Sequence, residues 1–260
     1  MVMKIENYET WKSSVTADTF SFPYNPISFD SQNISNHEIK MLPFSDHHIA
    51  ISGGGHSPIN LILRGHFSGS SKFTNYRRLS KHFHETWLLK KLYFESDKFF
   101  IGIGKDIKRT HTGGRTNFID YVANFQSLFG IAFDDVEKNN SGGVVANEGD
   151  VPTYITEISG TITSGSSDLV ISDNFGNEIK VSSSDLATSD SFVYRLISFI
   201  ESTAGIYITT FGYCTINGLQ VNTITKGLGV LKLASGEDSS DISISNLTSS
   251  TIKFRNGWSV

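Results

Sequence analysis

The segment Gly102–Lys105 comes closest in this sequence to a phosphate-binding loop, because it ends in Gly-Lys. A Walker A loop also needs a glycine five residues before that lysine's glycine and a hydroxyl residue directly after the lysine. Phe99 and Asp106 stand at those two positions. Residues 99–103 alternate apolar and small residues as a strand does, so the sequence favours a strand here over a nucleotide site.

The histidines suggest metal binding, since all eight lie between His37 and His111. His82 and His84 are two residues apart on an expected helix and would point to different sides of it. No His-Glu-x-x-His spacing occurs, and the single cysteine excludes a site made of several thiolates. We therefore expect no metal site, and histidines that lie at the surface or at an interface.

Two further patterns have simple structural interpretations. Asp173, Asn174, Asn177 and Glu178 resemble parts of a calcium loop, but their glycine falls at the fourth position instead of the sixth, so turn chemistry explains them. Cys214 lies in an expected strand, which predicts a core thiol and not a nucleophile.

Nothing in the sequence has the pattern of an established catalytic site. No Gly-x-Ser-x-Gly is present, and the paired carboxylates Asp134 and Asp135 lie in a polar segment. A glycosidase pair with partners distant in sequence stays open, although no motif supports a hydrolase of cell-wall glycans. We expect no catalytic residue, no cofactor and no enzymatic activity.

Charge is divided unevenly along the 260 residues. Residues 1–130 hold 15 Lys and Arg against 11 Asp and Glu, a net +4, whereas residues 131–260 hold 7 against 15, a net −8. The total of −4 argues against specific nucleic-acid recognition, which usually needs a basic face. The longest apolar run is about five residues, far short of the roughly 20 that span a bilayer. No membrane segment or secretory signal is expected, and we expect a soluble chain made in the cytoplasm.

This asymmetry predicts two domains joined by a polar segment that contains Gly142 and Gly143 and ends near Pro152. The expected bounds are 1–138 for the first domain, 139–152 for the linker and 153–260 for the second domain.

In the first half, period-2 alternation predicts a hairpin over 48–69 with its turn at Gly53–Gly55. Apolar residues at spacings of three and four, from Phe73 to Leu88, predict one amphipathic helix over 73–92. Strands over 91–96, 98–111 and 116–129 follow. The last two predict a long hairpin with its tip at 111–114.

The second half is a series of short β-patterns with frequent turn residues, including a tight turn at 174–177. Such spacing predicts a β-sandwich. The expected strands are Tyr154–Ile162, Leu169–Ser172, Glu178–Val181, Phe192–Phe199, Gly205–Thr210, Tyr213–Asn217, Leu228–Leu233, Ile242–Ser245 and Thr251–Arg255.

Two groups of residues are candidates for contacts with other molecules. Charged residues near the long hairpin's tip are expected at an oligomer interface: Arg109, His111 and Arg115. Aromatic residues of the expected sandwich are candidates for stacking on sugar rings: Tyr207, Tyr213 and Trp258.

The order of these elements resembles the distal tail proteins of long-tailed, non-contractile (siphovirus-like) phages. The likeness is most specific in three segments: ANEGDVPTYITEISG at 146–160, LVISDNFGNEIKV at 169–181, and the closing stretch from Leu233 to Trp258. The first resembles the family's approach to its C-terminal domain, in which an Asn-x-Gly phrase and a proline precede a strand.

The resemblance implies a mainly β fold. Its N-terminal β-sandwich, a ring-forming domain, carries one α-helix and a long β-hairpin, and a galectin-like or carbohydrate-binding-like sandwich follows. It also implies a structural role at the distal end of the virion tail. Six copies would form a homo-hexamer ring that joins the tail tube protein to the tail tip and adhesion proteins. The alternative is a carbohydrate-binding module whose sandwich binds host-surface polysaccharide.

Overall fold

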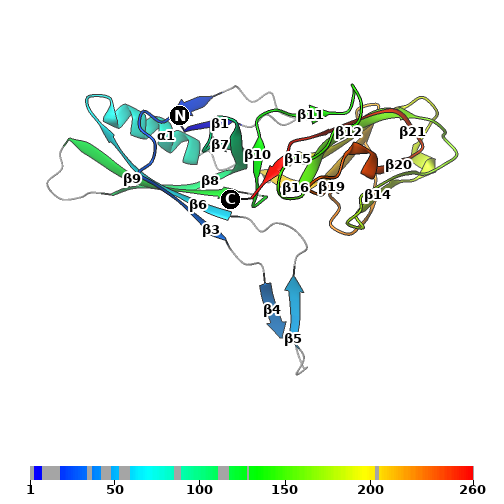
Figure 1. The fold of residues 1–260 in the computed structure, drawn as a ribbon, viewed down its shortest axis with the longest axis horizontal. Coiled ribbons are helices and arrows are strands. Elements are labelled where there is room, and N and C mark those ends of the chain that lie inside the picture. Colours follow the sequence, from blue (N-terminus) through cyan, green and yellow to red (C-terminus); the bar gives the residue numbers. More distant parts are fainter. Residues whose placement is uncertain are drawn as a thin grey trace. The chain divides into compact units, whose positions relative to one another are not determined.

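The protein is mainly β, with one α-helix among the residues that the structure describes (Figure 1). This computed structural model describes residues 3–7, 18–33, 37–41, 48–52, 59–84, 89–110, 117–127, 129–202 and 205–259. They divide into two compact units, the first ending at Ala132 and the second spanning Phe133–Ser259. The expected mainly β fold class is confirmed, and the galectin-like character of the second domain stays a prediction.

Most strands of the first unit form one antiparallel sheet in the order β2-β1-β7-β8-β9-β6-β3. A separate two-stranded sheet pairs β4 with β5. The bounds are Lys4–Asn7 (β1), Thr19–Ser21 (β2), Ser28–Asn33 (β3), His37–Met41 (β4), His48–Ser52 (β5), Ile59–Ser68 (β6), Lys90–Tyr93 (β7), Lys98–Thr110 (β8) and Phe118–Ser127 (β9).

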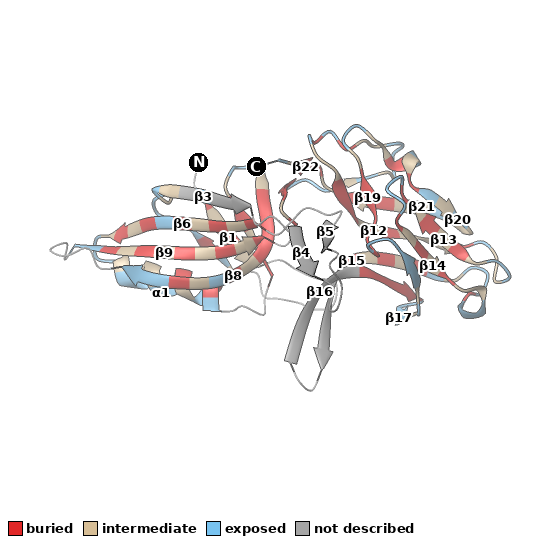
Figure 2. Ribbon diagram, turned by 90° about the horizontal axis from the view of Figure 1, so that it is seen from below, coloured by how far each residue is buried: buried red, intermediate tan, exposed pale blue. Residues whose placement is uncertain are grey.

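Helix α1 (Lys72–His84) covers one face of this sheet, where it lies along β8 and β9 (Figures 1 and 2). Its buried residues are Leu79, His82 and Phe83. Gly104 of β8 lets the helix approach closely, because a Cβ at this position would lie only 2.7 Å from the Phe83 Cα. Strand β9 buries every second residue against this side, as period-2 patterning requires.

Two expectations for the first half are wrong. The hairpin over 48–69 does not form, because β5 pairs with β4 while β6 pairs with β3 and β9. Alternation identifies the face that a strand buries but not the strand beside it. The helix is also shorter than 73–92, since residues 90–93 pair with β1 and β8 as strand β7. The expected turn at Gly53–Gly55 and the helix residues 85–88 lie outside the described residues.

Strands β8 and β9 of the expected long hairpin pair as predicted, and the expected tip at 111–114 lies outside the described residues. The ladder between the two strands runs from the pair Gly102 and Ser127 to the pair Thr110 and Asp120. A register shift between Gly104 and Asp106 marks a bulge. Gly102 and Lys105 lie inside strand β8, which agrees with the strand interpretation and not with a phosphate loop.

The second unit is a β-sandwich. One sheet has the order β11-β21-β12-β15-β16-β17, with β19 paired to β12, and the other has the order β18-β14-β13-β20. The bounds are Lys138–Asn139 (β11), Thr153–Ile162 (β12), Leu169–Ser172 (β13), Glu178–Val181 (β14), Ser191–Ser202 (β15), Gly205–Ile216 (β16), Leu219–Gln220 (β17), Ile224–Lys226 (β18), Lys232–Leu233 (β19), Ser243–Ser245 (β20) and Leu247–Phe254 (β21). Two short 3₁₀ helices cover Ser183–Asp185 and Ser239–Asp241.

The core of the sandwich consists of apolar side chains from both sheets, with Ile158 and Phe192 from one and Ile171 and Ile179 from the other. These side chains are at most 1% exposed. Removing so much apolar surface from water is the main stabilising contribution to a sandwich.

Most strands expected in this half are confirmed, and β13 and β14 have the expected bounds. Two expected strands, 205–210 and 213–217, are one continuous strand, β16. The expected strand at 228–233 contains only the two-residue strand β19. The turn at 174–177 is confirmed, with Gly176 at a φ of 80°.

Residues 138–152 make many hydrogen bonds within the second unit. Strand β11 pairs with β21, and isolated bridges join Ala146 to Asp238 and Val151 to Gly257. The first unit ends within β10 (Ala132–Asp134), which pairs with β22 (Gly257–Trp258). Whether 1–138, 139–152 and 153–260 behave as separate domains and a linker stays a prediction.

Candidate functional site

One end of the first unit's sheet gathers side chains suited to binding another protein. Strand β6 ends there at Ser68, which pairs with Phe118, and β8 ends there at Thr110, which pairs with Asp120. Helix α1 begins four residues after the end of β6, at Lys72. The chain therefore brings four elements to one place.

Phe73 is the centre of this region on the helix side. Phe73 is 48% exposed, and the Arg109 Cζ lies 5.5 Å from its ring centroid. The Lys72 Nζ lies 5.6 Å from the same centroid. Each exposed cation–π contact contributes about 0.5–1 kcal/mol, enough to hold the two cations beside the ring. The result is an exposed aromatic group with two positive charges next to it.

A second aromatic group lies at the same end of the sheet. The His66 ring stacks on Tyr24 at 6.3 Å between centroids and meets Phe118 edge-on at 5.2 Å. Ile27, which is 74% exposed, is joined to this end by a backbone hydrogen bond to the Arg64 carbonyl oxygen at 2.7 Å. The His66 and Phe118 side chains lie on the sheet face opposite helix α1, because they alternate with the residues that β6 and β9 bury beneath the helix. We call the helix-side group the tip surface and define it as Lys72, Phe73 and Arg109.

Sequence reasoning finds only part of the tip surface. Arg109 is expected at an interface, and it is exposed there. The other two expected residues, His111 and Arg115, lie outside the described residues, so the three-residue interface stays a prediction. The helical spacing places Phe73 on the apolar face of the helix. Its position beside Lys72 in the first helical turn could have indicated an exposed aromatic residue.

A charged cluster fixes α1 to the chain before β2. The Asp18 Oδ2 accepts a hydrogen bond from the Lys81 Nζ at 2.7 Å, and this bond holds the pKa of Asp18 below its usual value. His82, nearby, is only 2% exposed, with its ring centroid 6.4 Å from that of Phe20. The expectation of surface or interface histidines is therefore wrong for His82, which faces the sheet and packs in the core.

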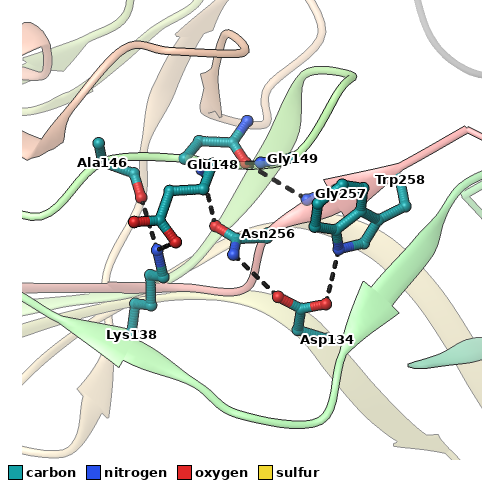
Figure 3. A network of polar contacts seen from close by, with 9 residues as sticks. Asp134, Lys138, Ala146, Glu148, Gly149, Asn256, Gly257 and Trp258 are labelled. Atoms are coloured by element: carbon teal, nitrogen blue, oxygen red, sulfur yellow. Dashed lines mark hydrogen bonds and ion pairs between the residues drawn. The ribbon is translucent and has the colours of Figure 1, made fainter. Parts of the chain in front are cut away.

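In the second unit, a polar network joins the segment 134–149 to the segment 256–258 (Figure 3). The carboxylate of Asp134 accepts hydrogen bonds from the Trp258 indole Nε1 at 2.6 Å and from the Asn256 Nδ2 at 2.8 Å. The Asn256 Oδ1 accepts in turn from the backbone N–H of Glu148 at 3.0 Å. With both Asp134 oxygens bonded in this way, the carboxylate acts as a structural link between two segments.

Asn147 is the most connected residue of this network and is fully buried. Its Nδ2 donates to the carbonyl oxygens of Val151, Leu233 and Ala234 at 3.0–3.3 Å. Its Oδ1 accepts from the backbone N–H groups of Gly149 and Gly257 at 3.1 and 3.3 Å. One side chain thus satisfies backbone groups of three chain segments, which explains the Asn-x-Gly phrase physically.

A charged cluster lies on the neighbouring strands β12, β15 and β21. The carboxylate of Glu157 contacts the Arg195 Nε at 2.7 Å and the Lys253 Nζ at 2.9 Å. Burial alone would raise the pKa of Glu157, but the hydrogen bonds from these two cations outweigh it and hold the pKa below its usual value. The cluster favours the ionised carboxylate.

The residues considered for metal binding or catalysis have structural roles where they are described. The Asp173 carboxylate accepts hydrogen bonds from the backbone N–H groups of Phe175, Asn177 and Lys232 and from the Asn177 side chain, at 2.8–2.9 Å. The turn interpretation is confirmed. Cys214 is 1% exposed, and burial raises the pKa of its thiol to about 12, so the core-thiol prediction is also confirmed.

The described residues offer few other features that could bind a ligand. No group of three or more His, Cys, Asp or Glu side chains among them could hold a metal ion. In that part of the chain, no helix has the length and apolar character needed to cross a membrane. A groove of about 400 Å³ lies in the sandwich, between hydroxyl groups such as those of Ser239 and Ser250 and aliphatic groups such as Ile244.

The three residues expected to contact glycans lie in different environments. Tyr213 is 8% exposed, and the Trp258 indole is bonded to Asp134. Tyr207 lies on β16, but its side chain is outside the described part of the structure. Neither Tyr213 nor Trp258 lines the groove. Their contact with sugars stays a prediction.

Comparison with known proteins found similar solved structures but no matching family model and no matching curated protein. The SPP1 Dit protein, a hub of the adsorption apparatus in phages that infect Gram-positive bacteria, is similar at 12% identity and a TM-score of 0.43 over 89% of this chain and 92% of its own. Two structures of the phage P2 baseplate in its activated conformation are similar at 11% and 10% identity, with TM-scores of 0.46 and 0.38. Each of these matches covers 98% of this chain and 97% of the other. All three solved structures are thus of proteins of a phage adsorption hub or baseplate.

Proposed function

We propose that this chain is a structural protein of a phage tail, located at the distal end of the virion tail. Six copies would form a ring that joins the tail tube to the tail tip and the host-adhesion apparatus. The protein would act through assembly and not through turnover of a substrate. The first unit would build the ring, and the second unit would face the adhesion proteins.

The observation that carries this proposal is the tip surface of the first unit. Protein interfaces are enriched in aromatic residues and arginine, and the tip surface combines the exposed Phe73 ring with Arg109. A rigid sheet and helix position these groups, so binding would cost little conformational entropy.

The order of elements gives further support. A helix, a strand and a long hairpin precede a sandwich whose first strand, β12, begins at Thr153. This is the order on which the resemblance to distal tail proteins rests. The Asn-x-Gly phrase before that strand is occupied by Asn147 and Gly149, which close the sandwich through their hydrogen bonds.

Negative-stain electron microscopy with mass photometry tests the proposal. We expect rings with a central hole and a mass six times the 28.7 kDa of one chain. A Phe73→Ala variant should form fewer rings at equal protein concentration, because it removes the central aromatic group of the tip surface. A particle of single-chain mass at every concentration would contradict the proposal.

A titration with host polysaccharide tests the alternative. A purely structural hub gives no saturable change in tryptophan fluorescence. A saturable change in a protein that remains a single chain would favour a carbohydrate-binding module instead.

A further inference from the structure

We propose that the tip surface of one copy binds a short acidic segment, Asp135–Glu137, in the second unit of another copy. We call this segment the acidic turn. The inference rests on the proposed assembly function and deepens it by naming the two surfaces that would meet. The contact is head-to-tail, since each copy contributes a different patch to each of its two neighbours.

The tip surface presents an exposed aromatic ring. Phe73 is 48% exposed and is one of four large apolar residues that the described part of the first unit exposes. A single exposed apolar residue is ordinary, but an aromatic ring beside arginine is typical of protein interfaces. The cations Lys72 and Arg109 beside Phe73 give this site a positive charge.

The acidic turn has the complementary chemistry. Val136 is 74% exposed, and its two sequence neighbours, Asp135 and Glu137, are exposed as well. An apolar side chain flanked in the sequence by two carboxylates matches an aromatic ring with two cations nearby. The turn would place Val136 against Phe73 and the carboxylates near Lys72 and Arg109.

The acidic turn is also held in shape before binding. The Arg255 guanidinium donates to the backbone carbonyl oxygens of Asp134 and Asp135. The Glu137 Oε1 accepts a hydrogen bond from the Thr156 hydroxyl at 3.3 Å. Because these bonds fix the backbone and one carboxylate, less conformational entropy is lost when the turn docks.

The charge distribution along the chain favours this pairing. Residues 1–130 carry a net +4 and residues 131–260 a net −8. Complementary charges steer encounter and fix the orientation of partners, while like charges across an interface are strongly unfavourable. A head-to-tail contact closes into a ring when the rotation between neighbours divides a full turn evenly.

A charge-reversal experiment on the full chain tests the contact. One variant carries Lys72→Glu and Arg109→Glu, and the other carries Asp135→Lys and Glu137→Lys. Each variant alone presents like charges at every contact, so its self-association should weaken at least about tenfold. In an equal mixture, the reversed tip meets the reversed turn and the two native patches meet each other. Mixing should therefore restore assembly, as measured by mass photometry at low salt.

Two controls keep the test specific. Lys105→Glu with Lys226→Glu changes the net charge as much as the tip variant does, but at exposed positions outside the tip surface. This control should assemble like the unmodified protein. Circular dichroism melting should show that every variant is folded, since substitutions at exposed sites usually change stability by less than about 0.5 kcal/mol.

Rescue in the mixture supports the contact between these two surfaces. Rings that form equally well with either variant alone would overturn the contact and leave the hub proposal standing. Loss of assembly that mixing does not restore would also overturn the pairing. A wild-type protein that never self-associates would overturn both the contact and the ring.

Discussion

Replacing Asn147 by alanine should destabilise the second unit strongly. The substitution removes five hydrogen bonds of one side chain. Three of them are fully buried and reach the carbonyl of Leu233 and the N–H groups of Gly149 and Gly257. A buried polar group left without a partner costs about 1–3 kcal/mol. We therefore expect a loss of about 3–5 kcal/mol in the free energy of unfolding.

Urea denaturation measures this loss. With a typical slope of about 2 kcal/mol per molar urea, the midpoint of the second unit's transition should fall by about 1.5–2.5 M. Hydrogen exchange of peptides from β12 and β21 assigns the transition to this unit and not to the first one. The faster exchange should be confined to the sandwich.

The matched control is Asn174→Ala, which removes an exposed hydrogen bond from the Asn174 Nδ2 to Glu237 at 2.9 Å. The Glu237 carboxylate stays in contact with water after the substitution, so we expect the free energy of unfolding to change by at most about 0.5 kcal/mol. If Asn147→Ala shifted the midpoint no more than this control, the network around Asn147 would not carry the stability assigned to it.

Three further predictions concern the same unit. Gly149→Ala should destabilise it by more than about 2 kcal/mol, because a Cβ there would lie 1.9 Å from the Gly257 carbonyl oxygen, whereas Gly142→Ala meets nothing within 4 Å and should be neutral in thermal unfolding. Cys214 should resist a thiol reagent at pH 8 until urea unfolds the protein, since its pKa is raised to about 12, and rapid labelling of the native protein would show that the thiol is accessible. Glu157 has a folded-state pKa below its ordinary value of 4.5, so its contribution to stability is present above that pH and is lost as the pH falls through the folded pKa. Glu157→Gln should thus destabilise at pH 7 and progressively less in acid, and a difference that does not change with pH would argue against the ion-pair explanation.

Sequence periodicity predicts which segments are strands better than it predicts how they pair. The bounds of β13 and β14 follow from a tight turn whose Asp173 and Gly176 are visible in the sequence. Strand β5 is recognisable as a strand, but its pairing with β4 depends on contacts outside its own alternation. The helix predicted from the sequence extends too far for a similar reason. The apolar residues Leu89 and Leu92 fit a helical spacing as well as a strand.

The candidate site is harder to predict than the fold. Arg109 is identifiable from its place near a hairpin tip, but the tip surface also needs Lys72 and Phe73, which are far from it in the sequence. Only the packing of α1 on β8 brings them together. Trp258 shows that the sequence does not reveal which partner a candidate binding residue has in the fold. An aromatic residue in a polar segment looks available for stacking on a sugar, but the Trp258 indole donates a hydrogen bond to Asp134.

The position of β21 in its sheet has a consequence for biosynthesis. Strand β21, which lies between β11 and β12, is made more than 100 residues after β11. During translation, β11 and β12 lack the strand that pairs with both of them until residues 247–254 have left the ribosome. The sandwich therefore completes its folding only after β21 is made, long after the strands of the first unit. Assembly would then be timed by translation, because the acidic turn takes its final shape only when Arg255 arrives.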